Sequence, residues 1–262
     1  MARRYIVTRP AGHAGLLSQA LRRIGIDAVE IPTVAIIPPE SWDPLDGALR
    51  RLLEYDWILL TSRSGVEALF ERAGRTAVWP PALRWAAIGP GTAAALRAGG
   101  ITTVWIPSRF LGEAVAREMP VSRGDRVLRV RAAEASEIPS EGLRARGAEV
   151  TDVIAYRTQF PLMATGSRLA HVLAEGVEGV IFTSASTVRG FLHLVDAAGL
   201  RGSVATIRLI AIGPVTTAAI RAEGLVPYAV ASEHSVQGIV DVLAGRDDLE
   251  GSDHRAASVR ET

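Results

Sequence analysis

An internal repeat constrains this sequence more than any other feature. In each copy a short apolar run ends in Thr-Ser, a segment with helical periodicity follows, and an Ala-Ile-Gly-Pro-x-Thr turn comes next. The Thr-Ser pairs end at Ser62 and Ser184, which are 122 residues apart, and the turns contain Gly89 and Gly213, which are 124 apart. This period is too long for a solenoid repeat and has the size of a small domain. The sequence therefore predicts two similar domains, and two domains that face each other leave a cleft for a small ligand.

The alternation of elements predicts an α/β fold with parallel sheets. Short apolar runs alternate with amphipathic helical stretches along the whole chain. Several runs are almost entirely apolar, as expected for strands covered by helices on both faces. The predicted strands are residues 4–8, 28–31, 57–61, 85–88, 103–106, 126–130, 149–153, 180–183, 209–212 and 227–230.

A shorter similarity indicates how the two domains are assembled. Residues 4–9 and 25–30 flank a helical segment and resemble residues 126–131 and 147–150, which flank another. If this shorter unit is called a and the longer repeat b, the chain order is a, b, a, b. A five-stranded sheet needs one unit of each kind. The units can pair consecutively, or they can nest so that the middle b and a form an inserted domain.

The connecting segments favour the nested arrangement. Two β-prone runs, at 33–38 and 153–158, each follow the last strand of an a unit, and side by side they would form a two-stranded antiparallel linker. We expect two similar domains, each a five-stranded parallel sheet flanked by helices. The expected boundaries are 1–33 plus 160–245 for the first domain, 39–153 for the inserted one, 34–38 and 154–159 for the linker strands, and 246–262 for a disordered tail.

Composition excludes several kinds of chemistry. The chain has no Cys, and all 29 residues counted as Lys or Arg are Arg. Thiolate nucleophiles, Cys-bound metals, Schiff bases and Walker-type phosphate loops are therefore excluded. Five scattered His residues show no metal-ligand spacing, so no metal and no cofactor are expected.

Charge and hydropathy point to a protein that binds neither nucleic acid nor membrane. A formal net charge of +1 lacks the basic excess of a nucleic-acid binder. No apolar run reaches the roughly 18 residues of a membrane span, and the N-terminus enters a predicted strand directly, unlike a signal peptide. We expect a cytoplasmic protein. It is expected to be a monomer, because no heptad or interface stripe is visible.

Small polar residues follow four of the predicted strands. Because ligands bind beyond the carboxyl ends of parallel strands, these positions are candidate binding residues. Helix N-termini there offer free N–H groups and a positive dipole end, which suit carboxylate or phosphate. Simple N-capping is the other interpretation of each such site. The candidates are Ser62, Thr92, Ser184, Thr216 and Thr217, and the adjacent pair leaves open which threonine faces a ligand.

Arginines and one tyrosine complete the candidate set. Arg9, Arg63 and Arg131 follow predicted strands, where they can bind a carboxylate through two hydrogen bonds or remain solvated. Tyr156 lies in a predicted linker strand, where its phenol can donate a proton or only a hydrogen bond. The sequence contains no GxSxG or GxGxxG motif.

The ordered set of motifs resembles the uroporphyrinogen-III synthase family. The resemblance rests on Val-Thr-Arg-Pro at 7–10, the two Thr-Ser strand ends, the two Gly-Pro turns and the Tyr-bearing run at 153–158, and it covers about residues 4–244. It implies the nested two-domain fold with a two-stranded linker. It also implies a cofactor-free lyase (hydro-lyase) that cyclises hydroxymethylbilane, a linear tetrapyrrole with eight carboxylates, to uroporphyrinogen III with loss of water and inversion of ring D through a spiro intermediate.

The resemblance also implies roles for the candidate residues. Tyr156 would donate a proton to the leaving hydroxyl, as a contributor rather than an indispensable acid. Hydroxyls and helix N-termini at Ser62, Thr92, Ser184 and Thr216 or Thr217 would bind substrate carboxylates. Arg9, Arg63 and Arg131 would bind the same groups. The preceding enzyme of the pathway, the deaminase, is an expected transient partner.

Two other classes of function compete with this interpretation. A non-catalytic two-domain sensor would bind an anionic small molecule, but it would require an effector surface or output domain that the sequence does not show. An enzyme acting on phosphorylated substrates would use the Gly-Pro turns as phosphate sites, but no acid/base pair or metal-ligand cluster accompanies them.

Overall fold

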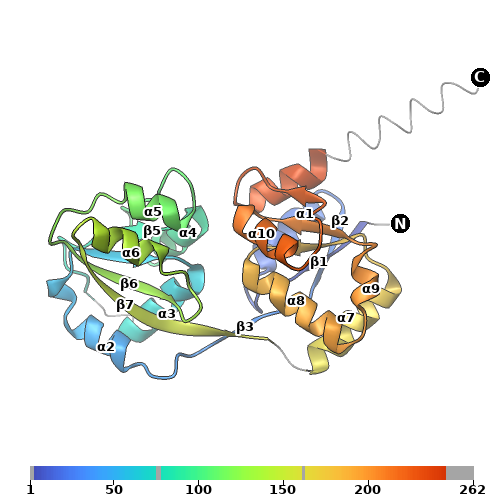
Figure 1. Cartoon of the computed structure of the whole chain (residues 1–262), viewed down its shortest axis with the longest axis horizontal. Helices are drawn as coiled ribbons and strands as arrows, with labels where there is room; N and C mark the ends of the chain where they lie inside the picture. The colour runs from blue at the N-terminus through green and yellow to red at the C-terminus, as the bar shows by residue number, and fades with distance from the viewer. Residues whose placement is uncertain (1–2, 75–77, 161–162, 246–262) are drawn as a thin grey trace, which may run out of the picture. The chain divides into compact units, whose positions relative to one another are not determined.

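The computed structural model describes residues 3–74, 78–160 and 163–245 (Figure 1). The predicted disordered tail at 246–262 lies outside these residues. The chain divides into two compact units. Unit 1 comprises residues 1–35 and 159–262, and unit 2 comprises residues 36–158.

Unit 1 contains a parallel five-stranded sheet with the order β10-β9-β8-β1-β2. Alternate residues of its strands enter two cores, one beneath α7, α8 and α10 and the other beneath α1 and a helix at 236–245. The short helix α9 follows α8. The bounds are β1 Arg3–Val7, α1 Gly15–Arg23, β2 Ile26–Glu30, α7 Met163–Glu175, β8 Gly179–Phe182, α8 Ala185–Ala197, α9 Arg201–Val204, β9 Arg208–Ala211, α10 Pro214–Ala222 and β10 Ala229–Val230.

Unit 2 has the sheet order β3-β7-β6-β4-β5, in which β7, β6, β4 and β5 pair in parallel. One face packs on α2, α3 and α4, and the other on α5 and α6. The bounds are β3 Ala35–Ile37, α2 Asp43–Arg50, the 3₁₀ turn η1 Leu52–Glu54, β4 Trp57–Leu60, α3 Arg63–Ala73, β5 Arg84–Ala87, α4 Pro90–Ala98, α5 Gly112–Glu118, β6 Arg126–Ala132, α6 Ile138–Ala145 and β7 Glu149–Gln159.

The internal repeat is visible in the backbone of both units. The order β7-β6-β4-β5 in unit 2 matches β2-β1-β8-β9 in unit 1. The N–H of Arg84 donates to Asp56 O, and the N–H of Arg208 donates to Glu178 O, both at 2.9 Å. The predicted α/β class with two parallel-dominated sheets is therefore confirmed.

The strand predicted at 103–106 is wrong. Only Trp105 reaches the sheet there, through an isolated parallel bridge to Ala86. Its N–H donates to Trp85 O at 2.8 Å, and its carbonyl accepts from the N–H of Ala87 at 2.9 Å. The next donor of this ladder would be residue 107, which is a proline and has no N–H. The fifth strand of unit 2 is instead β3, on the opposite edge.

The predicted linker segments also differ from expectation. Residues 154–159 are not a separate strand, since they continue β7 without a break, and β3 lies beside β7 in the sheet. The antiparallel direction of this pair stays a prediction. A single strand that is twice the usual length therefore carries Tyr156.

A cluster of polar side chains stabilises unit 1 around the partly exposed Glu178, the residue before β8. Its carboxylate accepts a bifurcated hydrogen bond from the single Nε–H of Arg3, at 3.1 and 3.0 Å, and one bond from the hydroxyl of Tyr5 at 3.0 Å. Burial acts to raise the pKa of this carboxyl, but the hydrogen bonds from Arg3 and Tyr5 outweigh it and lower the pKa. The ionised carboxylate therefore stabilises the folded state.

We expect Glu178→Gln to lower stability at neutral pH by about 2 kcal/mol, the scale of hydrogen bonds to a charged group. A lowered folded-state pKa contributes stability above the unfolded value of about 4.3 and loses it as the pH falls further. The variant should thus lose less stability than the wild type between pH 5 and pH 3 in thermal unfolding followed by circular dichroism. Glu149→Gln is the matched control, because Glu149 is 70% exposed in its pair with Arg126. Parallel pH curves for wild type and Glu178→Gln would contradict the assignment.

Candidate functional site

Serine hydroxyls cap the helices that follow β4 and β8, as the repeated Thr-Ser pattern indicates. Oγ of Ser62 accepts a hydrogen bond from the N–H of Gly65 at 3.0 Å at the start of α3. Oγ of Ser184 accepts from the N–H of Thr187 at 3.2 Å, and the Thr187 side chain accepts from the N–H of Ser184 at 3.3 Å. This reciprocal pair is a capping box at the start of α8.

The two Gly-Pro turns begin the helices α4 and α10 without a side-chain cap. Within the described residues no N-cap side chain accepts from the first N–H groups of these helices, so their positive ends suit an anion. Both glycines lie close to a neighbouring side chain. A Cβ on Gly89 would lie 3.2 Å from Cβ of Phe110, and a Cβ on Gly213 would lie 2.5 Å from Cδ2 of His234. Sequence reasoning gave Phe110 and His234 no role, because nothing in the local pattern places them at these turns.

The threonines of these turns are buried. Thr92 and Thr216 are the third residues of α4 and α10, and Thr217 is the fourth residue of α10. The Oγ1 atom of Thr217 is buried and has no hydrogen-bond partner among the described residues. Both Thr216 and Thr217 are thus buried in the first turn of α10.

Tyr156 and Ser62 meet in unit 2. The phenol of Tyr156 donates a hydrogen bond to Oγ of Ser62 at 3.0 Å. Ser62 already accepts from the N–H of Gly65, so both lone pairs of its oxygen are used and its own hydrogen is left to donate elsewhere. Burial raises the pKa of the Tyr156 phenol above its usual value of 10.0; the nearby charge of Glu134 adds to this, and the bond to Ser62 opposes it. The phenol is therefore neutral at physiological pH and acts as a donor.

The three predicted arginines lie at strand ends in different environments. Arg9 follows β1 and donates to the carbonyl oxygen of His13 at 3.4 Å. Arg63 is the first residue of α3, beside Ser62, and makes no hydrogen bond or ion pair to the described residues. Arg131, near the end of β6, is 12% exposed and pairs with Glu137 at 2.6 Å and with Asp152 at 3.4 Å. Of the three, Arg63 is best placed to accept an external anion.

Within each unit, the structure places the candidates at the carboxyl ends of neighbouring strands. Unit 2 carries Ser62 and Thr92 after β4 and β5, and Arg131 near the carboxyl end of the adjacent strand β6. Unit 1 carries Arg9, Ser184 and the Thr216–Thr217 pair after β1, β8 and β9. A hollow of about 420 Å³ between α7 and α9 lies elsewhere, before β8 and β9 begin.

The described part of the chain has neither a cluster of metal ligands nor a membrane-spanning helix. No group of three or more His, Asp or Glu side chains is placed there to hold a metal ion. None of the helices described is both long enough and apolar enough to cross a bilayer.

The structure defines an α/β protein with two units. In each unit, hydroxyl groups and helix N-termini follow the carboxyl ends of parallel strands, and unit 2 adds a neutral phenol, so each unit has a polar region that suits an anion. A family model described as uroporphyrinogen-III synthase HemD matches residues 16–241. The chain belongs to the uroporphyrinogen-III synthase family, whose members are cyclising lyases of porphyrin biosynthesis that act on a tetrapyrrole.

Individual relatives agree with this assignment. The uroporphyrinogen-III synthase of Synechococcus elongatus is 32% identical over 222 residues, which cover 81% of this chain and 83% of that protein. The chloroplastic enzyme of Oryza sativa is 28% identical, covering 84% of this chain and 72% of that protein. A mutant uroporphyrinogen III synthase from Thermus thermophilus has the same fold, with a TM-score of 0.62 and 21% identity over 92% of this chain and 96% of that one. The interpretation as a non-catalytic sensor is not favoured.

Proposed function

We propose that the chain cyclises hydroxymethylbilane to uroporphyrinogen III, with loss of water and inversion of ring D. The observation that carries this proposal is the hydrogen bond from Tyr156 to Ser62, beside Arg63. Tyr156 is a neutral proton donor, and Ser62 has a hydroxyl hydrogen that can reach a ligand. Arg63 adds a cation that has no partner within the described residues. Family membership supports the same reaction.

The proposed first step is loss of the terminal hydroxyl of the substrate. Ser62 donates its hydrogen to the leaving oxygen, and Tyr156 replaces it through the 3.0 Å hydrogen bond. The pyrrole ring that carried the hydroxymethyl group loses its N–H proton as the azafulvene forms. This proton returns to Tyr156, so the donor is restored and the proton count balances. The substituted carbon of ring D then attacks the azafulvene, and the spiro intermediate fragments and closes with ring D inverted. The protein mainly holds the chain bent.

The remaining candidates bind the eight carboxylates in this proposal. Positive helix ends and hydroxyls suit carboxylates, and guanidinium groups bind them through two hydrogen bonds. Because the chain has no Lys, every cationic contact must come from Arg or from a helix N-terminus. The proposed binding residues are Ser62, Thr92, Ser184, Thr216, Thr217, Arg9 and Arg63. Arg131 is not among them, because its guanidinium already pairs with Glu137 and Asp152.

The product isomer tests the proposal. Freshly prepared hydroxymethylbilane is incubated with the protein, the products are oxidised, and the porphyrin isomers are separated by chromatography. We expect the type III isomer to predominate, because spontaneous closure does not invert ring D. Heat-denatured protein is the control. A ratio of type III to type I equal to that of the control would overturn the proposed function.

Three further expectations stay predictions: a cytoplasmic location, a monomer, and transient contact with the preceding deaminase. The contact, if formed, would shorten the exposure of an unstable substrate to water.

A further inference from the structure

The strand β7 carries one extra residue next to Tyr156. Arg131 of β6 pairs with Ile154, but the next residue, Ala132, pairs with Tyr156, so Ala155 has no partner in the register. An inserted residue of this kind is a β-bulge, which redirects the side chains that follow it.

The bulge determines which face of the sheet Tyr156 occupies. Val153 and Ala155 point into the core beneath α3, and Asp152 points to the other face, where it contacts Ser140 of α6. Strict alternation would put Tyr156 on the same face as Asp152. With the bulge, Tyr156 packs against the core beneath α3, and its phenol reaches Ser62 at the start of that helix.

The end of β6 holds the bulge in place. The N–H of Ala133 donates to the carbonyl oxygen of Tyr156 at 3.0 Å. The guanidinium of Arg131 in turn fixes this segment, because its Nη1 atom donates to the carbonyl oxygens of Ala132 and Ala133 at 3.2 and 3.3 Å. A third bond reaches Ala135 O at 3.4 Å.

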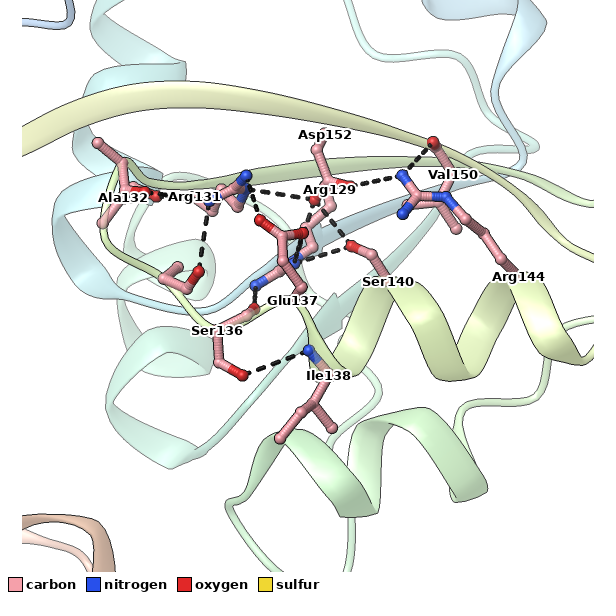
Figure 2. A network of polar contacts seen from close by, with 12 residues as sticks. Arg129, Arg131, Ala132, Ser136, Glu137, Ile138, Ser140, Arg144, Val150 and Asp152 are labelled. Atoms are coloured by element: carbon pink, nitrogen blue, oxygen red, sulfur yellow. Dashed lines mark hydrogen bonds and ion pairs between the residues drawn. The ribbon is translucent and has the colours of Figure 1, made fainter.

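A buried ion-pair network anchors Arg131 itself (Figure 2). Arg131 Nε lies 3.4 Å from Oδ1 of Asp152, which also accepts from Arg129 at 3.1 Å and from Ser140 at 2.8 Å. The Arg129 side chain is only 1% exposed, so this network is internal to unit 2. Nη2 of Arg131 donates a hydrogen bond to Oε1 of Glu137 at 2.6 Å.

We propose that Arg131 is a positioning residue, which holds the end of β6 against the bulge and thereby directs the Tyr156 phenol toward Ser62. This inference rests on the proposed function, in which Tyr156 supplies the proton through Ser62. It differs from the sequence-based role of Arg131 as a direct ligand of substrate carboxylates, because it assigns its guanidinium to three backbone carbonyls and to the carboxylates of Asp152 and Glu137.

A double-mutant cycle separates the two roles. Arg131→Met keeps the length of the side chain and removes the carbonyl contacts. Asp152 keeps Arg129, Ser140 and Arg144 as partners, so no buried charge is left unpaired and the variant should fold. We expect Arg131→Met to lower kcat about tenfold with little change in KM, and to have no further effect when Tyr156 is already Phe. A raised KM, or the same fold loss with and without the phenol, would show direct substrate binding and overturn the inference.

A structural readout does not depend on turnover. The absorbance titration of the wild type minus that of Tyr156→Phe reports the ionisation of this phenol, whose pKa burial raises above 10.0. In Arg131→Met the pKa should fall toward 10, because the phenol becomes more exposed. Arg144→Met is the matched control. Arg144 also contacts Asp152, at 2.7 Å, but bonds none of the carbonyls of the bulge segment, so both the titration and kcat should stay at wild-type values.

Glu137→Ala is a second variant for the same test. If Arg131→Met does not fold, Glu137→Ala removes only the half-exposed partner of Arg131 and should give a smaller change of the same sign. An unchanged titration in a folded variant would overturn the inference. Failure of the proposed function is recognised separately, as a wild-type protein that produces no excess of the type III isomer.

Discussion

Replacing Gly190 by alanine is expected to destabilise unit 1 by about 3 kcal/mol. A Cβ at this position of α8 would lie 2.0 Å from the carbonyl oxygen of Thr33, which is far inside contact distance. Thr33 cannot easily move, because its N–H donates to the carbonyl of Thr8 at 3.3 Å and its single hydroxyl hydrogen is shared between the carbonyls of Thr8 at 3.2 Å and Thr187 at 3.0 Å. Either α8 or the segment after β2 must move. Chemical denaturation followed by circular dichroism measures the loss.

Gly166→Ala is the matched control for this prediction. Gly166 also lies within a helix of unit 1, α7, but the nearest atom to a Cβ there is Cδ2 of Leu194 at 3.9 Å. Alanine should therefore fit and should raise stability by up to about 1 kcal/mol through its better helix propensity. Equal stability of the two variants would show that α8 does not approach residue 33 as closely as the structure has it.

The sequence predicts much of the fold because apolar runs and repeat spacing are local signals. Most predicted strands lie within about two residues of the observed ones. The false strand at 103–106 has the right composition, and its failure depends on one missing donor at Pro107. The length of β7 was missed for a different reason: an apolar run does not show whether its second half stays in the sheet or leaves it.

The candidate site is less predictable, because its contacts depend on register. Ser62 and Ser184 as caps follow from the Thr-Ser pattern, since capping is a local interaction. The contact between Tyr156 and Ser62 joins residues 94 positions apart and requires a bulge that no local pattern shows. The surroundings of Arg131 depend in the same way on Asp152, which lies 21 residues further along the sequence, on the neighbouring strand. The buried Arg129 was not singled out at all, because an arginine in a strand is typical of an exposed position.

Tyr156→Phe is expected to lower kcat about a hundredfold, the lower end of the range for a positioned proton donor. The ring can keep its packing against the core beneath α3, so the loss should come from the missing hydroxyl. Ser62 keeps the hydrogen bond from Gly65 and stays in place as the helix cap. We expect residual turnover to give the type III isomer still, because inversion of ring D depends on how the substrate is held. The initial rate of isomer formation under saturating substrate measures the change.

The pH dependence of the wild type gives an independent check on the same residue. Because burial raises the pKa of the phenol above 10.0, it keeps its proton through the neutral and mildly alkaline range. The kcat of the wild type should therefore show no loss from Tyr156 ionisation below pH 10. Tyr55→Phe is the matched control: Tyr55 is also buried in the core beneath α3 and makes no hydrogen bond through its hydroxyl within the described residues. It should leave kcat unchanged, and an equally silent Tyr156→Phe would remove Tyr156 from the reaction, leaving the fold and the family assignment unaffected.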